Sequence, residues 1–200
     1  MKQFNRITQQ LLDLQQADLR LRDELIQKGE LHKGYHPAME QDHNQNADAL
    51  AKIMDEIGYP TINKVGAAAS QAAWLIIQHA ISKPDFMRSC AEQLALAVKE
   101  QQANPQNLAY LLDRIAIFEG RPQLYGTGFD WDENGELNPQ TYDDLSQVNK
   151  RRIAIGLNTL EEQITIIRER AIQEKEAPPA DFEQRKAEID QWRRKVGWIK

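Results

Sequence analysis

Apolar residues recur every three or four positions along most of the chain, which is the spacing of one face of an α-helix. In residues 3–28 this stripe is interrupted once, where Asp18 occupies a position in the apolar seam. Leu12, Leu19 and Ile26 form a second stripe, seven residues apart. Two stripes indicate a helix that packs against two neighbours. We interpret the segment as a helix packed on the core, and the second stripe leaves open a homodimer through this N-terminal helix.

Helix signals of this kind predict eight helices, whereas strand signals occur only near residues 124–142. The predicted helices cover residues 3–28, 45–57, 65–81, 84–102, 105–120, 144–155, 159–176 and 181–196. Glycine and proline predict an irregular segment at 29–45, and Asn134-Gly135 suits the turn of a β-hairpin within residues 122–142. The expected fold class is mainly α: a single-domain helical bundle of seven or eight helices with one small β-hairpin.

The domain boundaries follow from one linker signal. Pro178-Pro179 separates the last predicted helix from the rest of the chain. We therefore expect a helical domain at residues 1–177 and a C-terminal helical appendage at 178–200. Because a free helix of this length is marginal in water, we expect the appendage to dock on its own chain or on a partner.

Composition and charge exclude several classes of protein. The single cysteine, Cys90, excludes an internal disulfide and a cysteine-based metal cage. The formal net charge of −5 argues against a general nucleic-acid binder, because such proteins need basic surface to neutralise phosphates. No apolar run approaches the length of a membrane span, and the first residues lack the apolar region of a secretory signal. We expect a cytoplasmic protein that does not bind membranes.

Polar residues within apolar helices are the candidates for chemistry, because a buried polar group costs free energy unless it is paired. Gln71 and His79 are eight residues apart, slightly more than two turns, so they share one side of the third predicted helix. A neutral imidazole in an apolar wall can act as a general base or bind a polar ligand. The alternative is a core histidine satisfied by a carbonyl or carboxylate, and the sequence alone favours this alternative.

Asp113 and Arg114 lie beside the apolar stripe of the fifth predicted helix. One of them can anchor the helix while the other faces a cleft, where the guanidinium fork of Arg114 would suit a carboxylate or a phosphate. The alternative is a buried ion pair that ties this helix to its neighbours, since buried charges must be paired. The sequence leaves both interpretations open.

Two patterns resemble metal-binding motifs, but each lacks a feature that a metal site requires. Asp130 opens the D-x-D-x-N-G sequence of a calcium loop, but its twelfth position is Thr141, where a bidentate glutamate is required. We therefore favour a plain turn. His32 and His36 have metal-ligand spacing only if they lie on a helix, and we interpret them, together with His43, as histidines of a surface loop. We expect no metal site and no cofactor.

Residues 46–170 contain several motifs in order. They are N-A-D-A-L-A-K-I-M-D-E-I-G-Y-P-T, A-A-W-L-I-I-Q-H-A, D-F-M-R-S-C, N-L-A-Y-L-L-D-R, E-G-R-P-Q-L-Y-G-T and V-N-K-R-R-I-A-I-G-L. Together they resemble a bacterial family classed only as a domain of unknown function, whose members show G-W-P-T, A-A-W-x-x-x-Q-H-A, L-x-D-R and G-x-P-Q-x-Y-G-T-Q. Tyr59 replaces the usual tryptophan of that pattern, and Gly128 replaces its final glutamine.

The resemblance brings no established activity. It implies that six residues belong to one shared pattern and converge in space. They are His79, Asp113, Arg114, Gln123, Tyr125 and Thr127. The function we favour is a binding or interaction module with a polar cleft between the third helix, the fifth helix and the hairpin. In that cleft, a small molecule or a protein would be bound by Gln71, Arg114, Gln123, Tyr125 and Thr127.

Two other functions remain open from the sequence. One is a small hydrolase or transferase in which His79 is the general base, Asp113 orients it and Arg114 binds an anionic group. The other is a toxin-neutralising protein, or another protein that binds a protein partner through its acidic surface. A shared cavity at His79 and Tyr125 would favour the binding module or the enzyme, and a filled core there would favour the partner-binding protein.

Overall fold

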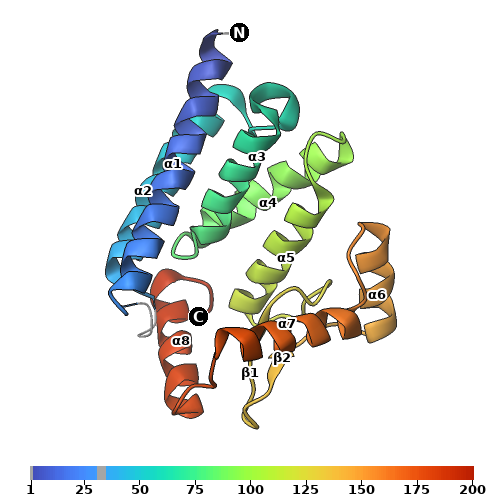
Figure 1. Ribbon diagram of the computed structural model, residues 1–200. Helices are drawn as coiled ribbons and strands as arrows, with labels where there is room; N and C mark the ends of the chain where they lie inside the picture. Colours follow the sequence, from blue (N-terminus) through green and yellow to red (C-terminus); the bar gives the residue numbers. More distant parts are fainter. Residues whose placement is uncertain (1, 31–34) are drawn as a thin grey trace. The chain divides into compact units, whose positions relative to one another are not determined.

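The computed structural model describes residues 2–30 and 35–200. Within them it has eight α-helices and one two-stranded antiparallel sheet, which confirms the mainly α prediction. The elements are α1 (Lys2–Gln27), α2 (Pro37–Ile57), α3 (Ile62–His79), α4 (Pro84–Lys99), α5 (Pro105–Glu119), β1 (Phe129–Trp131), β2 (Leu137–Pro139), α6 (Leu145–Ala154), α7 (Leu160–Glu174) and α8 (Phe182–Val196) (Figure 1).

The chain divides into two compact units, Met1–Asn104 and Pro105–Lys200, which we call the N-terminal and the C-terminal unit. The N-terminal unit contains α1 to α4, and the C-terminal unit contains the hairpin and α5 to α8. The domain assignment made from the linker at residues 178–179 stays a prediction. In the part of the chain that is described, no helix is both long enough and apolar enough to cross a membrane.

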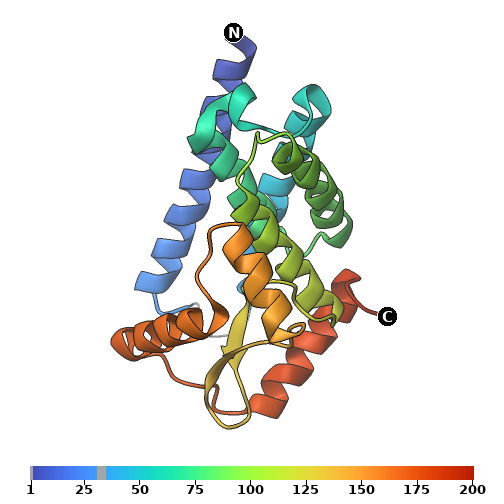
Figure 2. The ribbon, with the colours of Figure 1, turned by 90° about the vertical axis from the view of Figure 1, so that its right-hand side faces the viewer.

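The core of the N-terminal unit forms where α1 packs against α2 and α3, and α3 also contacts α4 (Figures 1 and 2). Ile7 and Leu11 of the first apolar stripe are fully buried. Ala72 and Ala73 of α3 are fully buried as well. Leu19, from the second stripe of α1, is 42% exposed. A homodimer through this stripe stays a prediction.

Helix α2 begins earlier than the sequence predicted. Pro37 occupies its first turn, and the Nδ1 atom of His36 accepts a hydrogen bond from the amide of Ala38 at 3.2 Å, so His36 is the N-cap. Proline at this position loses no helical hydrogen bond, because the first amides of a helix have no partner within it. The interpretation of residues 35–45 as irregular was therefore wrong from Pro37 onward.

The early start of α2 also corrects the interpretation of the histidines. His43 lies in the second turn of α2 and is buried, so it is not a surface-loop residue. His36 caps the helix and is only half-buried. His32 lies outside the described residues.

The hairpin of the C-terminal unit pairs Phe129 with Pro139 and Trp131 with Leu137, as the sequence predicted for this segment. Its turn is organised by Asp132, whose Oδ1 accepts from the amides of Asn134 and Glu136 at 2.9 Å. Helix α7 packs against β2, and α6 packs against α7 (Figure 2). The capping box predicted at the start of α7 is present, with Thr159 and Glu162 exchanging hydrogen bonds.

Helix α8 docks within the C-terminal unit. The Nε atom of Arg193 donates to the carbonyl oxygen of Phe118 at 2.7 Å. The Phe118 ring is stacked on Trp198 at 5.2 Å and meets the edge of Trp192 at 5.5 Å. Arg185 pairs with Asp130 of the hairpin at 2.7 Å. The last helix is therefore held by both aromatic and polar contacts.

Candidate functional site

Three titratable side chains from three helices meet inside the N-terminal unit. They are Asp18 of α1, His43 of α2 and His79 at the end of α3, and we call them the Asp18 cluster. The Oδ1 atom of Asp18 lies 3.0 Å from Nε2 of His43, and its Oδ2 atom lies 2.6 Å from Nδ1 of His79. The two imidazole rings are 4.7 Å apart. One carboxylate thus bridges two imidazoles.

The local sequence explains how each side chain reaches the cluster. Asp18 occupies a seam position of α1, so the packing of α1 on α2 and α3 carries its carboxylate inward. His43 faces inward because α2 already begins at Pro37. His79 is the last residue of α3, and Ala80 is the C-cap of this helix.

Burial and charge set the protonation of Asp18, whose side chain is 1% exposed. Burial alone would raise the pKa of this carboxyl, but hydrogen bonds from His43 and His79, with the charges of both imidazoles, hold the pKa well below its usual range. Asp18 is therefore an ionised carboxylate inside the protein. The side chain of His43 is 7% exposed, whereas that of His79 is 25% exposed and connects the cluster to solvent.

A second layer of polar groups surrounds the cluster. The hydroxyl of Tyr35 lies 2.6 Å from Nδ1 of His43, and the two rings are stacked at 5.7 Å. Burial raises the pKa of Tyr35, and the negative charges of Glu40, Asp18 and Asp42 add to the effect. Burial and then the charge of Asp18 also raise the pKa of Asp42. The surroundings of the cluster are therefore negative, which favours a cation.

The geometry suits two kinds of chemistry. The ligand atoms of Asp18, His43 and His79 all lie within 4.8 Å of one another, which is the arrangement of a metal site with two histidines and one carboxylate. Alternatively, a carboxylate that accepts the Nδ1–H of a histidine fixes its tautomer and leaves Nε2 free to take a proton. His79 has both the carboxylate partner and the exposure for this second role.

The predicted site residues divide between the two units. His79 belongs to the Asp18 cluster, and Gln71 lies on the exposed side of α3. The other predicted residues belong to the C-terminal unit, and they are Asp113, Arg114, Gln123, Tyr125 and Thr127. The predicted cleft would combine residues of both units, so it stays a prediction.

Within the C-terminal unit, Asp113 holds the loop that follows α5. Its carboxylate is fully buried and accepts hydrogen bonds from the amides of Leu124 at 2.8 Å, Tyr125 at 3.1 Å and Thr127 at 2.9 Å. The Thr127 hydroxyl also donates to it, at 3.0 Å. Burial raises the pKa of Asp113, and these donors oppose the rise. Both carboxylate oxygens are used by the protein's own loop.

Gln123 and Arg152 complete this loop network. The Nε2 atom of Gln123 donates to the carbonyls of Gly128 and Gln140 at 3.0 and 2.9 Å, and its Oε1 accepts from the amide of Gly128 at 2.6 Å. Arg152 is buried and donates to the carbonyls of Tyr125 and Asn158 at 2.8 and 2.6 Å. The side chain of Arg114 on α5 is accessible to solvent, but the protein around its guanidinium desolvates it and lowers its pKa.

A model of a protein family matches residues 5–175 of the chain. The chain belongs to DUF6624, a family of unknown function. The match includes both the Asp18 cluster and the Asp113 loop network, and it extends to either side of the motifs at residues 46–170. No curated protein and no solved structure matches the chain.

Sequence reasoning found one member of the cluster in this DUF6624 chain and missed two. The signal for Asp18 was visible as the one charged residue in the apolar seam of residues 3–28, but it was interpreted only as an interruption. The signal for His43 was hidden because Gly34 and Pro37 suggested a loop. A proline at the first turn of a helix carries the opposite meaning.

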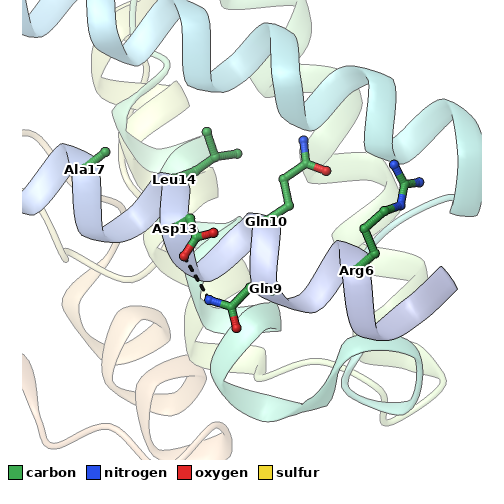
Figure 3. Close-up of a pocket in the computed structure, with 6 residues that line it drawn as sticks. All are labelled: Arg6, Gln9, Gln10, Asp13, Leu14 and Ala17. Atoms are coloured by element: carbon green, nitrogen blue, oxygen red, sulfur yellow. Dashed lines mark hydrogen bonds between the residues drawn. The ribbon is translucent and has the colours of Figure 1, made fainter. Parts of the chain in front are cut away.

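A separate groove of about 590 Å³ runs along α1 and is lined by Arg6, Gln9, Gln10, Asp13, Leu14 and Ala17 (Figure 3). Across it, Nε2 of Gln9 donates to Oδ1 of Asp13 at 2.8 Å. All six residues come from a single helix, so the groove has no convergent polar groups from several elements. In this member of DUF6624 the Asp18 cluster is the stronger candidate site.

Proposed function

We propose that the protein is a binding module whose ligand is a divalent transition-metal ion held by Asp18, His43 and His79. The observation that supports this proposal is the convergence of three ligand atoms within 4.8 Å from three different helices. The proposal keeps a binding module, the class of function expected from the sequence, but it replaces the expectation of no metal site and takes all three ligands from the N-terminal unit.

The donor atoms indicate the class of metal. Two imidazole nitrogens and one carboxylate oxygen suit zinc, iron, cobalt, nickel or manganese better than calcium, which prefers six to eight oxygens. Three protein ligands with one half-exposed histidine leave a coordination position for water or a substrate, as in catalytic rather than structural zinc sites. Cys90 does not contribute, because it is buried beside Met54, with 3.8 Å between the sulfur atoms.

The distances within the cluster allow an ion to enter after small side-chain rotations. Two atoms that each lie about 2.1 Å from a tetrahedral ion are roughly 3.4 Å apart. The observed separations of 3.0 and 2.6 Å are therefore short by less than about 1 Å. In the absence of an ion, hydrogen bonds between the carboxylate and the imidazoles keep the same atoms together.

The test is a metal titration of protein that has first been treated with a chelator. We expect one Co²⁺ or Zn²⁺ ion per chain, a visible Co²⁺ absorption spectrum of a site with nitrogen and oxygen ligands, and a higher melting temperature with metal. His43→Ala and His79→Ala should each abolish this binding. His36→Asn is the matched control, because it removes an imidazole outside the cluster and leaves a side chain that can cap α2. Wild-type protein that binds neither ion, or His79→Ala protein that binds like the wild type, would overturn the proposal.

A second candidate function is acid–base catalysis by His79, as in a small hydrolase or transferase. The observation that favours it is the 2.6 Å separation between Oδ2 of Asp18 and Nδ1 of an imidazole that is 25% exposed. In this proposal Asp18 takes the orienting role that the sequence suggested for Asp113, since the oxygens of Asp113 hold the loop network.

Chemical modification of the metal-free protein tests this candidate. His79 should react with diethylpyrocarbonate faster than His43, because its ring is more exposed and its Nε2 lone pair is available. Asp18→Asn should slow the reaction of His79, since the amide no longer favours the Nδ1–H tautomer. Equal reactivity of His79 in the two proteins would exclude the role assigned to Asp18.

A further inference from the structure

We infer that Tyr35 is a positioning residue for the metal site, whose hydroxyl reverses its hydrogen bond with His43 when an ion binds. The inference rests on the proposed metal-binding function. It assigns a role to a side chain that touches no ion itself but touches a ligand of that ion.

The first step is the hydrogen-bond chain without metal. The Nε2 atom of His43 faces Oδ1 of Asp18 at 3.0 Å, and its Nδ1 atom faces the Tyr35 hydroxyl at 2.6 Å. Both oxygens of Asp18 face an imidazole nitrogen, so the carboxylate accepts from each ring, and in the neutral form of His43 the proton lies on Nε2. Nδ1 then has a lone pair, and the hydroxyl of Tyr35 donates to it.

The second step is the change that an ion requires. A metal ion binds the lone pair of an imidazole nitrogen, so Nε2 of His43 must lose its proton to become a ligand. The neutral ring keeps one proton, which then resides on Nδ1. The number of protons on His43 is unchanged, and the proton passes from one ring nitrogen to the other through solvent.

The third step is the change in hydrogen bonding that follows at Tyr35. With a proton on Nδ1, His43 becomes a donor toward Tyr35, and the tyrosine oxygen must now accept. A neutral phenol can do both, because it has one donor and acceptor lone pairs. The carbonyl oxygen of His79 lies 3.5 Å from the same hydroxyl and offers the displaced phenol proton a new acceptor. A partner for the outer nitrogen of a metal-bound histidine fixes its tautomer and ring orientation.

The environment of Tyr35 holds it in this place. Its ring is stacked on the His43 ring at 5.7 Å, which restricts rotation of both side chains. A phenylalanine at this position would keep the stacking and lose both directions of the hydrogen bond. Removing the hydroxyl oxygen of Tyr35 therefore separates the contribution of its hydrogen bond from that of its ring stacking.

The experiment compares the zinc affinity of wild-type protein, Tyr35→Phe and the matched control Tyr59→Phe, which removes the hydroxyl of a buried tyrosine elsewhere in the same unit. We expect Tyr35→Phe to bind one ion about 10- to 100-fold more weakly. We expect its melting temperature without metal to fall as well, because Nδ1 of His43 then loses its donor, and we expect Tyr59→Phe to bind zinc like the wild type. Equal zinc affinity of wild-type and Tyr35→Phe protein would overturn the inference while leaving the metal site intact. Absence of zinc binding in the wild type would instead overturn the proposed function.

A second measurement decides the matter even if Tyr35→Phe folds poorly. Nitrogen-15 NMR of the wild-type histidine rings reports which nitrogen carries the proton. We expect His43 to carry it on Nε2 without metal and on Nδ1 with zinc bound. A proton on Nδ1 in both states, or zinc bound at Nδ1, contradicts a reversal of the Tyr35 hydrogen bond.

Discussion

Asp113 and Arg152 hold the same residue from its two polar groups: the carboxylate accepts the amide of Tyr125 at 3.1 Å, and the guanidinium donates to its carbonyl at 2.8 Å. Both side chains are buried. Such an arrangement stabilises one conformation of the loop, because a buried amide or carbonyl without a partner costs free energy. The L-x-D-R and G-x-P-Q-x-Y-G-T motifs thus meet in a structural network within the C-terminal unit.

The first prediction concerns this loop. Asp113→Ala should lower the free energy of unfolding by about 3–5 kcal/mol, because three amides and a hydroxyl lose a buried acceptor. Glu169→Ala is the control, and it should change stability by about 0.5 kcal/mol or less, because Glu169 is exposed on α7 of the same unit. Urea unfolding of both variants provides the measurement. A stable Asp113→Ala protein would favour a ligand site over a structural role for this carboxylate.

The second prediction concerns the position where this chain has glycine instead of the glutamine usual in the resembled pattern. A Cβ atom on Gly128 would lie 2.2 Å from Cδ1 of Ile117 and 3.2 Å from Oε1 of Gln123. Gly128→Ala should therefore destabilise the protein by about 1–3 kcal/mol through overpacking. Ile117→Val removes the clashing methyl group, so it should cost less in the Gly128→Ala background than in the wild type. Thermal unfolding of the single and double variants tests this coupling, and strictly additive effects would argue against the contact.

The third prediction concerns pH and the Asp18 carboxylate. Its pKa is lowered in the folded protein, so its ionised form stabilises the fold above the ordinary aspartate pKa of 3.8. This contribution is lost as the pH falls below that value toward the lower pKa of the folded state. Asp18→Asn should reduce stability by about 1–3 kcal/mol at pH 7, and the difference from the wild type should shrink in more acidic solution. A difference that stays constant between neutral and strongly acidic pH would contradict the cause given for the shift.

The fourth prediction concerns α8. Truncation after Ala177 should expose the Phe118 ring and leave its carbonyl without the Arg193 donor, so the melting temperature should fall. The single substitution Trp198→Ala should reproduce part of the fall, because Trp198 is buried and stacked on Phe118. Calorimetry of the two variants is the measurement. An unchanged melting temperature in the truncated protein would show that these contacts do not stabilise the unit.

The sequence by itself determined the elements that depend on local interactions. Helical periodicity predicted seven or eight helices, the Asn134-Gly135 turn predicted the hairpin, and the capping box marked the start of α7 at Leu160. Backbone hydrogen bonds, caps and turn conformations involve residues a few positions apart, so these features can be predicted from short stretches of sequence. The one clear error, at Pro37, arose because proline can either break a helix or begin it.

Only the tertiary structure decided which polar residues meet. His43 and His79 lie 25 and 61 positions after Asp18 in the sequence. Their convergence depends on the faces that α1, α2 and α3 turn toward one another, which the packing of apolar stripes sets. The same applies to Asp113. The amides that donate to its carboxylate lie in a loop whose path depends on Gln123 and Arg152. A spacing along one helix predicts neighbours on that helix, but the neighbours contributed by other helices follow from packing across the whole unit.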